Sequence, residues 1–226
     1  MRRKTTFLLS LLLTIALGVS AQTSEPRHEI LLETDSGNVR IALYNETPQH
    51  RDNILRLVEA HAYDGVLFHR VISNFMVQTG DLGSIGAPQG KLLGDTPEKY
   101  SVPAEIRFPQ LFHKRGAVAA AREGDDVNPE RRSSATQFYI VWGRQWDDAS
   151  LDKLQQRIDQ MTQGTVKLTP EIREVYKTLG GTPHSYTVFG EVVEGLEVVG
   201  RIEKAATDDH DRPLKDIRVV RATVVK

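Results

Sequence analysis

Arg70 stands among large apolar side chains, with Phe68 two residues before it and Phe75, Met76 and Gln78 shortly after it. Because side chains alternate along a strand, Phe68 and Arg70 are predicted to share one face of the first segment, and Met76 and Gln78 one face of the second. A fixed cation beside an apolar pocket suits a substrate that is mostly neutral but has one polar atom whose electron pair matters.

Other kinds of chemistry have less support in the sequence. No cysteine occurs in the 226 residues, so disulfides and thiolate chemistry are excluded. There is no G-x-S-x-G motif and no serine and histidine in a context that suggests an activated nucleophile. The run from Asp208 to Asp211 contains three acidic residues and a histidine, but consecutive acidic residues in a polar loop are usually solvated. We therefore expect no metal site.

The N-terminal residues have the pattern of a secretory signal peptide. Arg2, Arg3 and Lys4 precede an apolar run over residues 7–19, and small residues at 19–21 form a cleavage site. The run is too short to cross a bilayer comfortably, and polar residues follow from Gln22, although an uncleaved anchor stays open. We expect a signal peptide at 1–21 and a periplasmic or otherwise exported mature chain at 22–226, with no membrane span after cleavage.

Net charge and chain length further limit the class of protein. The chain has 29 Lys and Arg against 30 Asp and Glu, and residues 1–21 hold three of the basic residues, so the mature chain carries a charge of about −4. Such a balance argues against nucleic acid as a partner. The residues after position 21 are enough for one domain that carries an insertion, and two independent domains are less favoured.

Short strands dominate the remaining pattern. Asp35-Ser36-Gly37-Asn38 predicts a tight turn between two strands, and Thr47-Pro48 predicts the start of a helix over 48–62. A loop rich in glycine spans 83–94, and a short amphipathic helix is expected at 196–202. Strands with only peripheral helices favour a closed barrel over a doubly wound sheet. The expected strands cover residues 30–34, 38–43, 116–121, 136–142, 187–193 and 217–225.

Residues 147–181 have a helical pattern instead. Apolar residues at 151, 154, 158 and 161 recur at helical spacing, and Thr169-Pro170 begins a second helical stretch. This segment is interpreted as a helical insertion. Its apolar stripes are expected to pack on the barrel wall, since short helices need tertiary support, and a partner-binding or substrate-restricting role stays open.

Several separated motifs together resemble cyclophilin-type peptidyl-prolyl isomerases. The resemblance implies a mainly β fold, a closed eight-stranded antiparallel β-barrel capped by two α-helices, with the active groove outside the barrel. It implies no metal and no organic cofactor, and proline-containing peptides and unfolded or folding proteins as partners. The motifs are Phe68-His69-Arg70-Val71-Ile72, Phe75-Met76, Gln78, Gly80-Asp81, Gly116 to Arg122, Thr136-Gln137-Phe138-Tyr139-Ile140 and Thr187-Val188-Phe189-Gly190-Glu191-Val192.

The resemblance also implies roles for single residues. Arg70 is similar to the family's catalytic donor, which faces the prolyl nitrogen as the peptide bond twists, and a neighbour such as Gln78 is expected to hold its guanidinium. The proline pocket and the backbone-binding groove would be lined by the remaining positions. These substrate-binding positions are Phe75, Met76, Gln78, Ala121, Arg122, Gln137, Tyr139 and Tyr186.

Five residues need separate comment. Tyr139 stands where many relatives have phenylalanine, and its hydroxyl needs a partner or must reach solvent. Arg122 replaces a frequent asparagine and would favour acidic or carbonyl-rich peptides, and Tyr186 replaces a frequent histidine. Trp146 is a candidate for the far wall of the pocket. His69 is expected to face away from Arg70 and to form structural hydrogen bonds.

Two functions of different classes remain. The first is an isomerase that accelerates cis/trans isomerisation of X-Pro bonds and assists the folding of exported proteins. The second is a non-catalytic peptide-binding or chaperone module that uses the same groove or the helical insertion. A monomer is expected, although the sequence leaves the oligomeric state open.

Overall fold

The structure is a computed structural model that describes residues 25–183 and 185–226. One eight-stranded sheet runs in the order β10-β1-β2-β9-β6-β8-β4-β3, and β5 pairs with β7 separately. The strands are β1 (Glu29–Thr34), β2 (Gly37–Leu43), β3 (Arg70–Ile72), β4 (Met76–Thr79), β5 (Ser101–Val102), β6 (Ala117–Ala120), β7 (Ser133–Ser134), β8 (Phe138–Val141), β9 (Val188–Glu194) and β10 (Val219–Val224). The helices are α1 (Pro48–Glu59), α2 (Asp148–Thr162), α3 (Pro170–Thr178), α4 (Leu196–Ile202) and the 3-10 turn η1 (Leu82–Ser84).

The sheet is open, so the expected closed barrel is not what the strand pairing shows. The edge strands β3 and β10 do not pair with each other as strands. Backbone hydrogen bonds of 2.8 Å instead join Phe68 N to Ile217 O and Val219 N to Val66 O, between the chain before β3 and the start of β10. The chain that faces β10 there is the irregular stretch before β3, which forms the isolated bridge of Leu67 with Arg218 in place of a ladder. The result is a curled half-barrel.

The hollow of the curled sheet holds the main core. Phe68, Phe138 and Phe189 are each at most 2% exposed and lie there with the aliphatic residues of β1 and β2. Phe68 joins Val71 in this cluster, so the prediction that Phe68 shares the face of Arg70 was wrong. The strand alternation fails because β3 begins only at Arg70, which leaves Phe68 outside the pleat.

Helix α1 packs against β9 and β10 through Ile54, Leu57 and Val58. Thr47 is the N-cap residue and Pro48 the first helical residue, as predicted, but the Thr47 side chain makes no capping hydrogen bond. Glu105 performs this role, since its carboxylate accepts from the backbone N–H groups of Gln49 (3.2 Å) and His50 (3.0 Å). Helix α4 contacts β2 and has the predicted bounds.

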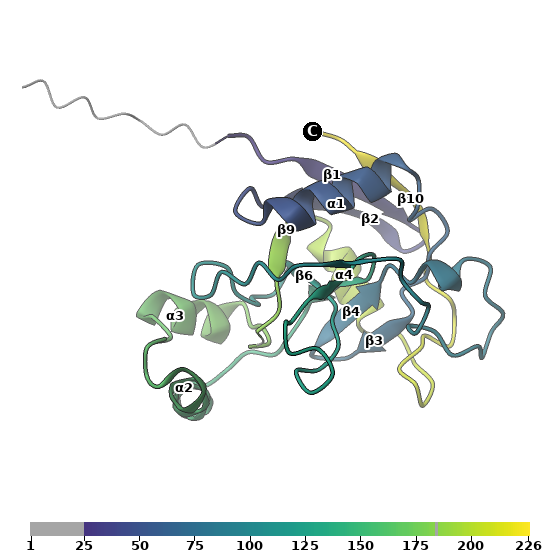
Figure 1. The fold of residues 1–226 in the computed structure, drawn as a ribbon. Coiled ribbons are helices and arrows are strands. Elements are labelled where there is room, and N and C mark those ends of the chain that lie inside the picture. Colours follow the sequence, from purple (N-terminus) through teal and green to yellow (C-terminus); the bar gives the residue numbers. More distant parts are fainter. Residues whose placement is uncertain (1–24, 184) are drawn as a thin grey trace, which may run out of the picture.

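Helices α2 and α3 lie at one side of the sheet, away from α1 (Figure 1). Asp147 and Thr169 cap them by accepting from Ser150 N (2.7 Å) and Ile172 N (3.3 Å). Met161 is 75% exposed, which departs from the predicted stripe because it lies in the last turn of α2. The two helices form a small core of their own with the chain before β6. It contains Leu151, Ile158, Leu168, Ile172 and Tyr176, with Phe108, Phe112 and Trp146 packed against it.

Within residues 25–183 and 185–226, no helix is long and apolar enough to cross a membrane. The predicted signal peptide at 1–21 lies outside the described residues.

Candidate functional site

Four neighbouring strands place the predicted site residues on the outer face of the sheet. The register pairs Arg70 with Gln78, Gln78 with Tyr139 and Tyr139 with Ala119. Paired residues of adjacent antiparallel strands point to the same face, so Arg70, Gln78 and Tyr139 form one row. Val71 and Val77, one residue along, point into the core.

A cavity of about 160 Å³ opens on this row. Arg70, with 44% of its side chain exposed, lies on its lining, while Met76 and Tyr139 are 2% and 5% exposed. The cavity is therefore a slot with an apolar floor and a solvated cation beside it. Its lining is Arg70, Phe75, Met76, Gln78, Ala121, Arg122, Tyr139 and Tyr186. They include every residue predicted for the site except Gln137 and the far-wall candidate Trp146.

The Arg70 guanidinium is held by Asp211 and not, as expected, by Gln78. Arg70 Nε donates to Asp211 Oδ2 at 3.4 Å, and the backbone fixes this aspartate because Val71 N donates to Asp211 O at 2.8 Å. Asp211 has φ 62°, a conformation that aspartate and asparagine tolerate better than most residues. From the sequence, Asp211 was interpreted only as a solvated residue of a polar loop.

A larger cavity of about 690 Å³ adjoins the slot and shares Gln78, Ala121 and Arg122 with it. Gln137 lies on this larger cavity. Gln78 Nε2 donates to Gln137 Oε1 at 3.1 Å, and Gln137 Nε2 donates to the Gly94 carbonyl at 2.8 Å. The two glutamines therefore connect the slot to the loop that forms the far rim.

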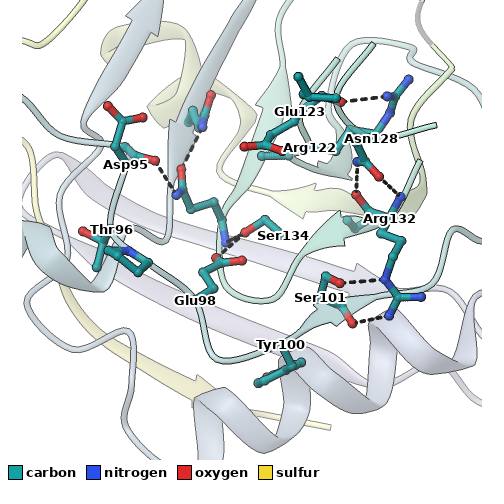
Figure 2. A pocket seen from close by; sticks show the side chains of 17 residues that line it. Asp95, Thr96, Glu98, Tyr100, Ser101, Arg122, Glu123, Asn128, Arg132 and Ser134 are labelled. Carbon is teal, nitrogen blue, oxygen red and sulfur yellow. Dashed lines mark hydrogen bonds between the residues drawn. The ribbon is translucent and has the colours of Figure 1, made fainter. Parts of the chain in front are cut away.

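The rim of the larger cavity is a fixed structure (Figure 2). Arg132 donates to Ser101 Oγ at 2.7 Å and to Ser101 O at 2.9 Å. On the opposite part of the rim, Glu98 accepts from Ala135 N at 2.7 Å and from Thr136 Oγ1 at 2.8 Å. These contacts tie residues 94–101 to the chain around β7.

Arg122 lies between the two cavities, but its charge is already compensated. Its guanidinium stacks on Tyr186, 4.3 Å from the ring centroid, and Nη1 donates to Asp125 at 2.6 Å. The Arg122 hydrogen bond, followed by that of Arg131, holds the pKa of Asp125 below its usual range. The side chain of Arg122 is only 3% exposed. The expected attraction of acidic peptides by a free cation is therefore not supported.

The hydroxyl of Tyr139 has a buried partner. His113 Nε2 lies 2.9 Å from it, and His113 is 1% exposed. Burial raises the pKa of Tyr139 well above its usual value, so the hydroxyl keeps its proton. Trp146 does not line the slot, which corrects the far-wall prediction. Its Nε1 donates to Gly181 O at 3.0 Å, and its ring packs within the core of α2 and α3.

His69 is 3% exposed and is absent from the lining of both cavities. Burial lowers its pKa. Neither ring nitrogen makes a hydrogen bond of good geometry to the described residues, so the expected structural hydrogen bonds are not found.

The described residues contain no group of three or more side chains placed to hold a metal ion. In the acidic turn, Asp208 Oδ1 accepts from the backbone N–H groups of His210 (2.9 Å) and Arg212 (3.0 Å). The Asp208 carboxylate is thus already hydrogen-bonded to the local backbone.

The slot, with Arg70 beside it, and the adjoining larger cavity thus lie next to each other on the outside of a curled antiparallel sheet. The family model described as cyclophilin type peptidyl-prolyl cis-trans isomerase/CLD matches residues 29–224. The chain belongs to this family.

Curated relatives agree with the family assignment. A peptidyl-prolyl cis-trans isomerase of Arabidopsis thaliana is 28% identical over 196 residues, covering 86% of this chain and 94% of the relative. Peptidyl-prolyl cis-trans isomerase-like 3 of Gallus gallus is 31% identical over 202 residues, with the same coverage. The protein of that name from Homo sapiens is 30% identical over 202 residues.

Solved structures support the fold. A cyclophilin-type isomerase of Cryptosporidium parvum superposes with a TM-score of 0.58 at 20% identity, covering 88% of this chain and 98% of that one. The same protein crystallised in the presence of the dipeptide Ala-Pro gives a TM-score of 0.57. At this identity the likeness concerns the fold alone.

Proposed function

We propose that this protein catalyses cis/trans isomerisation of X-Pro peptide bonds, with Arg70 as the catalytic residue. One observation carries the proposal: Arg70 lies beside the apolar floor of the slot, to which Phe75, Met76 and Tyr139 contribute. A pyrrolidine ring is apolar and compact, and the slot of about 160 Å³ has room for it.

The chemistry requires no bond to break. Partial double-bond character gives the peptide bond a rotation barrier of about 18–20 kcal/mol. As the bond twists, the lone pair of the prolyl nitrogen is no longer delocalised, so a donor aimed at this nitrogen stabilises the transition state more than the planar ground state. Among the described residues Asp211 is the hydrogen-bond partner of the Arg70 side chain, through Nε. The terminal N–H groups of the guanidinium therefore stay available to substrate.

The rest of the groove suits an extended peptide. Gln78, Ala121 and Arg122 line both cavities, so the chain next to the proline would pass over them into the larger one. Gln137, fixed by Gln78 and Gly94, offers amide groups to a peptide backbone. Substrates are accordingly proline-containing peptides and proline-containing segments of unfolded or folding proteins.

The cellular setting belongs to the same proposal. The basic, apolar and small residues of 1–21 favour export, so the substrates would be exported or periplasmic proteins and the mature chain would begin near residue 22. The segment 147–181, which forms α2 and α3, is proposed as an insertion into the family's fold. The protein is proposed to act as a monomer.

A protease-coupled assay on a short proline-containing peptide tests the proposal. Arg70→Ala should lower kcat/KM by about 10²-fold or more, the size expected for the loss of one transition-state donor. Arg70→Lys should recover only part of the loss, because lysine lacks the rigid fork of N–H groups. Arg221→Ala is the matched control, since Arg221 is also exposed and paired with one carboxylate, Glu33.

The same assay separates the enzyme from the binding module. If wild-type protein binds the peptide but leaves the isomerisation rate at the uncatalysed value, the chain is a non-catalytic binder. A wild-type rate in Arg70→Ala, with circular dichroism showing an intact fold, would remove Arg70 from the mechanism.

A further inference from the structure

We infer that His113 is a positioning residue for the proline slot, and that it connects the slot to the base of the α2 and α3 segment. The inference rests on the proposed function, since it assigns a support to the slot where the proline ring would bind. His113 does not line the slot itself and therefore acts through Tyr139.

The contact between His113 and Tyr139 is buried and specific. The hydroxyl and Nε2 lie 2.9 Å apart, and the two rings stack with centroids 6.0 Å apart at 22°. Tyr139 is 5% exposed, so its hydroxyl has little access to water. A buried hydroxyl without a partner costs about 1–3 kcal/mol, so this hydrogen bond strongly favours one position of the ring.

Tyr186 extends the contact to a cluster of three rings. It meets His113 edge-on at 6.4 Å and 82°, and Tyr139 at 6.1 Å and 72°. Tyr139 and Tyr186 both line the slot, and Arg122 covers Tyr186 from the groove side. His113 lies against both slot-lining tyrosines, so its position fixes the width of the slot.

The backbone of His113 is attached to the end of the α2 and α3 segment. His113 O accepts from Thr182 N at 2.9 Å, and Gly181 forms bridges with Lys114 and with Arg144. A Cβ at Gly181 would lie 2.3 Å from His113 O, so the two backbones are in close contact.

Trp146 links this contact to the core of the two helices. Its indole donates to Gly181 O at 3.0 Å, and its ring lies 6.3 Å from that of Tyr176, on α3. A continuous series of contacts thus runs from α3 through Trp146, Gly181 and His113 to Tyr139. The segment of α2 and α3 thereby supports the side of the slot that Tyr139 forms.

A double-variant cycle in the protease-coupled assay tests the inference. His113→Leu removes the partner and leaves the Tyr139 hydroxyl unpaired, so kcat/KM should fall about tenfold, mainly through KM, while kcat changes less than about twofold. His113→Gln, which can still bond the hydroxyl, should lose less than about threefold. In Tyr139→Phe the hydroxyl is absent, so adding His113→Leu should cause little further loss.

Other results would overturn it. If the losses of His113→Leu and Tyr139→Phe multiply, or if His113→Leu leaves KM unchanged, His113 does not act through the hydroxyl. If His113→Leu fails to fold, the double variant should fold, because it contains no unpaired hydroxyl. A double variant that is equally unfolded would contradict the inference.

Two further measurements complete the test. Trp146→Phe replaces the indole with a smaller aromatic ring that has no donor for Gly181 O, and should raise KM about twofold to fivefold without changing kcat. An unchanged KM would remove the link to the helices. Should the wild type show no turnover, the proposed function fails, and a crystal structure of His113→Leu decides the inference separately. A displaced Tyr139 ring supports it, and an unmoved ring overturns it.

Discussion

Arg70 Nε lies 3.4 Å from Oδ2 of Asp211, a residue 141 positions later in the chain. Both side chains are more than two-fifths exposed, so the pair contributes little to stability, about 0–1 kcal/mol. Its importance lies in orientation, because a guanidinium held at Nε presents its terminal N–H groups in one direction. The acidic turn at 208–211 thereby becomes part of the site.

Asp211→Asn should lower kcat/KM by about twofold to fivefold, the equivalent of about 0.5–1 kcal/mol. Asparagine tolerates the positive φ at this position, so the turn should keep its shape. The control is Asp209→Asn, which removes the same charge from the same turn.

Salt provides a second check on this pair. Roughly 1 M salt reduces the Debye length to about 3 Å. The difference in kcat/KM between wild type and Asp211→Asn should therefore become smaller at high salt. Equal kcat/KM for the two proteins at low salt would show that Asp211 does not orient Arg70.

Gln137→Glu should raise KM several-fold. A carboxylate can still accept from Gln78, but it cannot donate to the Gly94 carbonyl, which would then face a negative charge. The far rim of the groove should loosen, while kcat should change little because Arg70 is untouched. An unchanged KM for peptides long enough to reach the larger cavity would contradict this role.

Much of the fold could be predicted from local sequence. The turn at Gly37, with φ 123°, the proline at the start of α1 and the bounds of α4 all follow from short-range patterns. Closure of the barrel did not follow, because it depends on how two segments far apart in the sequence meet. The chain that faces the start of β10 is the irregular stretch before β3, and no short-range pattern marks it as irregular.

The site was predictable to the same degree. Strand alternation and family motifs selected the residues of the slot, since these lie on neighbouring strands in register. Their partners were missed: Asp211 for Arg70, Asp125 for Arg122 and His113 for Tyr139. Asp211 and His113 lie on other segments, in a turn and ahead of β6, so no spacing rule connects them to the site. Asp125 is three residues from Arg122, but no sequence pattern in a polar loop shows which carboxylate will pair with the arginine.

Acidification below about pH 6.5 should destabilise the protein through His50. Its Nδ1 lies 2.7 Å from Glu105 Oε2 and its Nε2 2.9 Å from Ser133 Oγ, and it is 3% exposed. Burial lowers its pKa, although Glu105 opposes the shift. The unfolded chain therefore binds a proton at a higher pH than the native one, so stability is lost as pH falls from about 6.5 toward the native pKa.

Urea unfolding between about pH 7.5 and pH 5 measures this effect. His50→Gln should weaken the dependence of stability on pH. Part of this dependence should remain, because burial also lowers the pKa of His69. If His50 were instead a charged partner of Glu105, its contribution would be lost as pH rises. Stability that falls between pH 6 and pH 7.5 in wild type but not in His50→Gln would establish that opposite sign.

Gly143→Ala should destabilise the protein more than Gly86→Ala does. Both glycines have positive φ, 65° and 67°, so each substitution costs about 1–2 kcal/mol for the left-handed conformation. At Gly86 nothing lies within 4 Å of the added Cβ, whereas at Gly143 the Cβ would lie 2.2 Å from the backbone of Gly181. The backbone there must shift, which adds about 1–3 kcal/mol. Denaturant midpoints give the difference in stability. KM should rise in Gly143→Ala alone, because Gly181 lies against the backbone carbonyl of His113. Equal losses of stability in the two variants would mean that the contact between Gly143 and Gly181 can open at no cost.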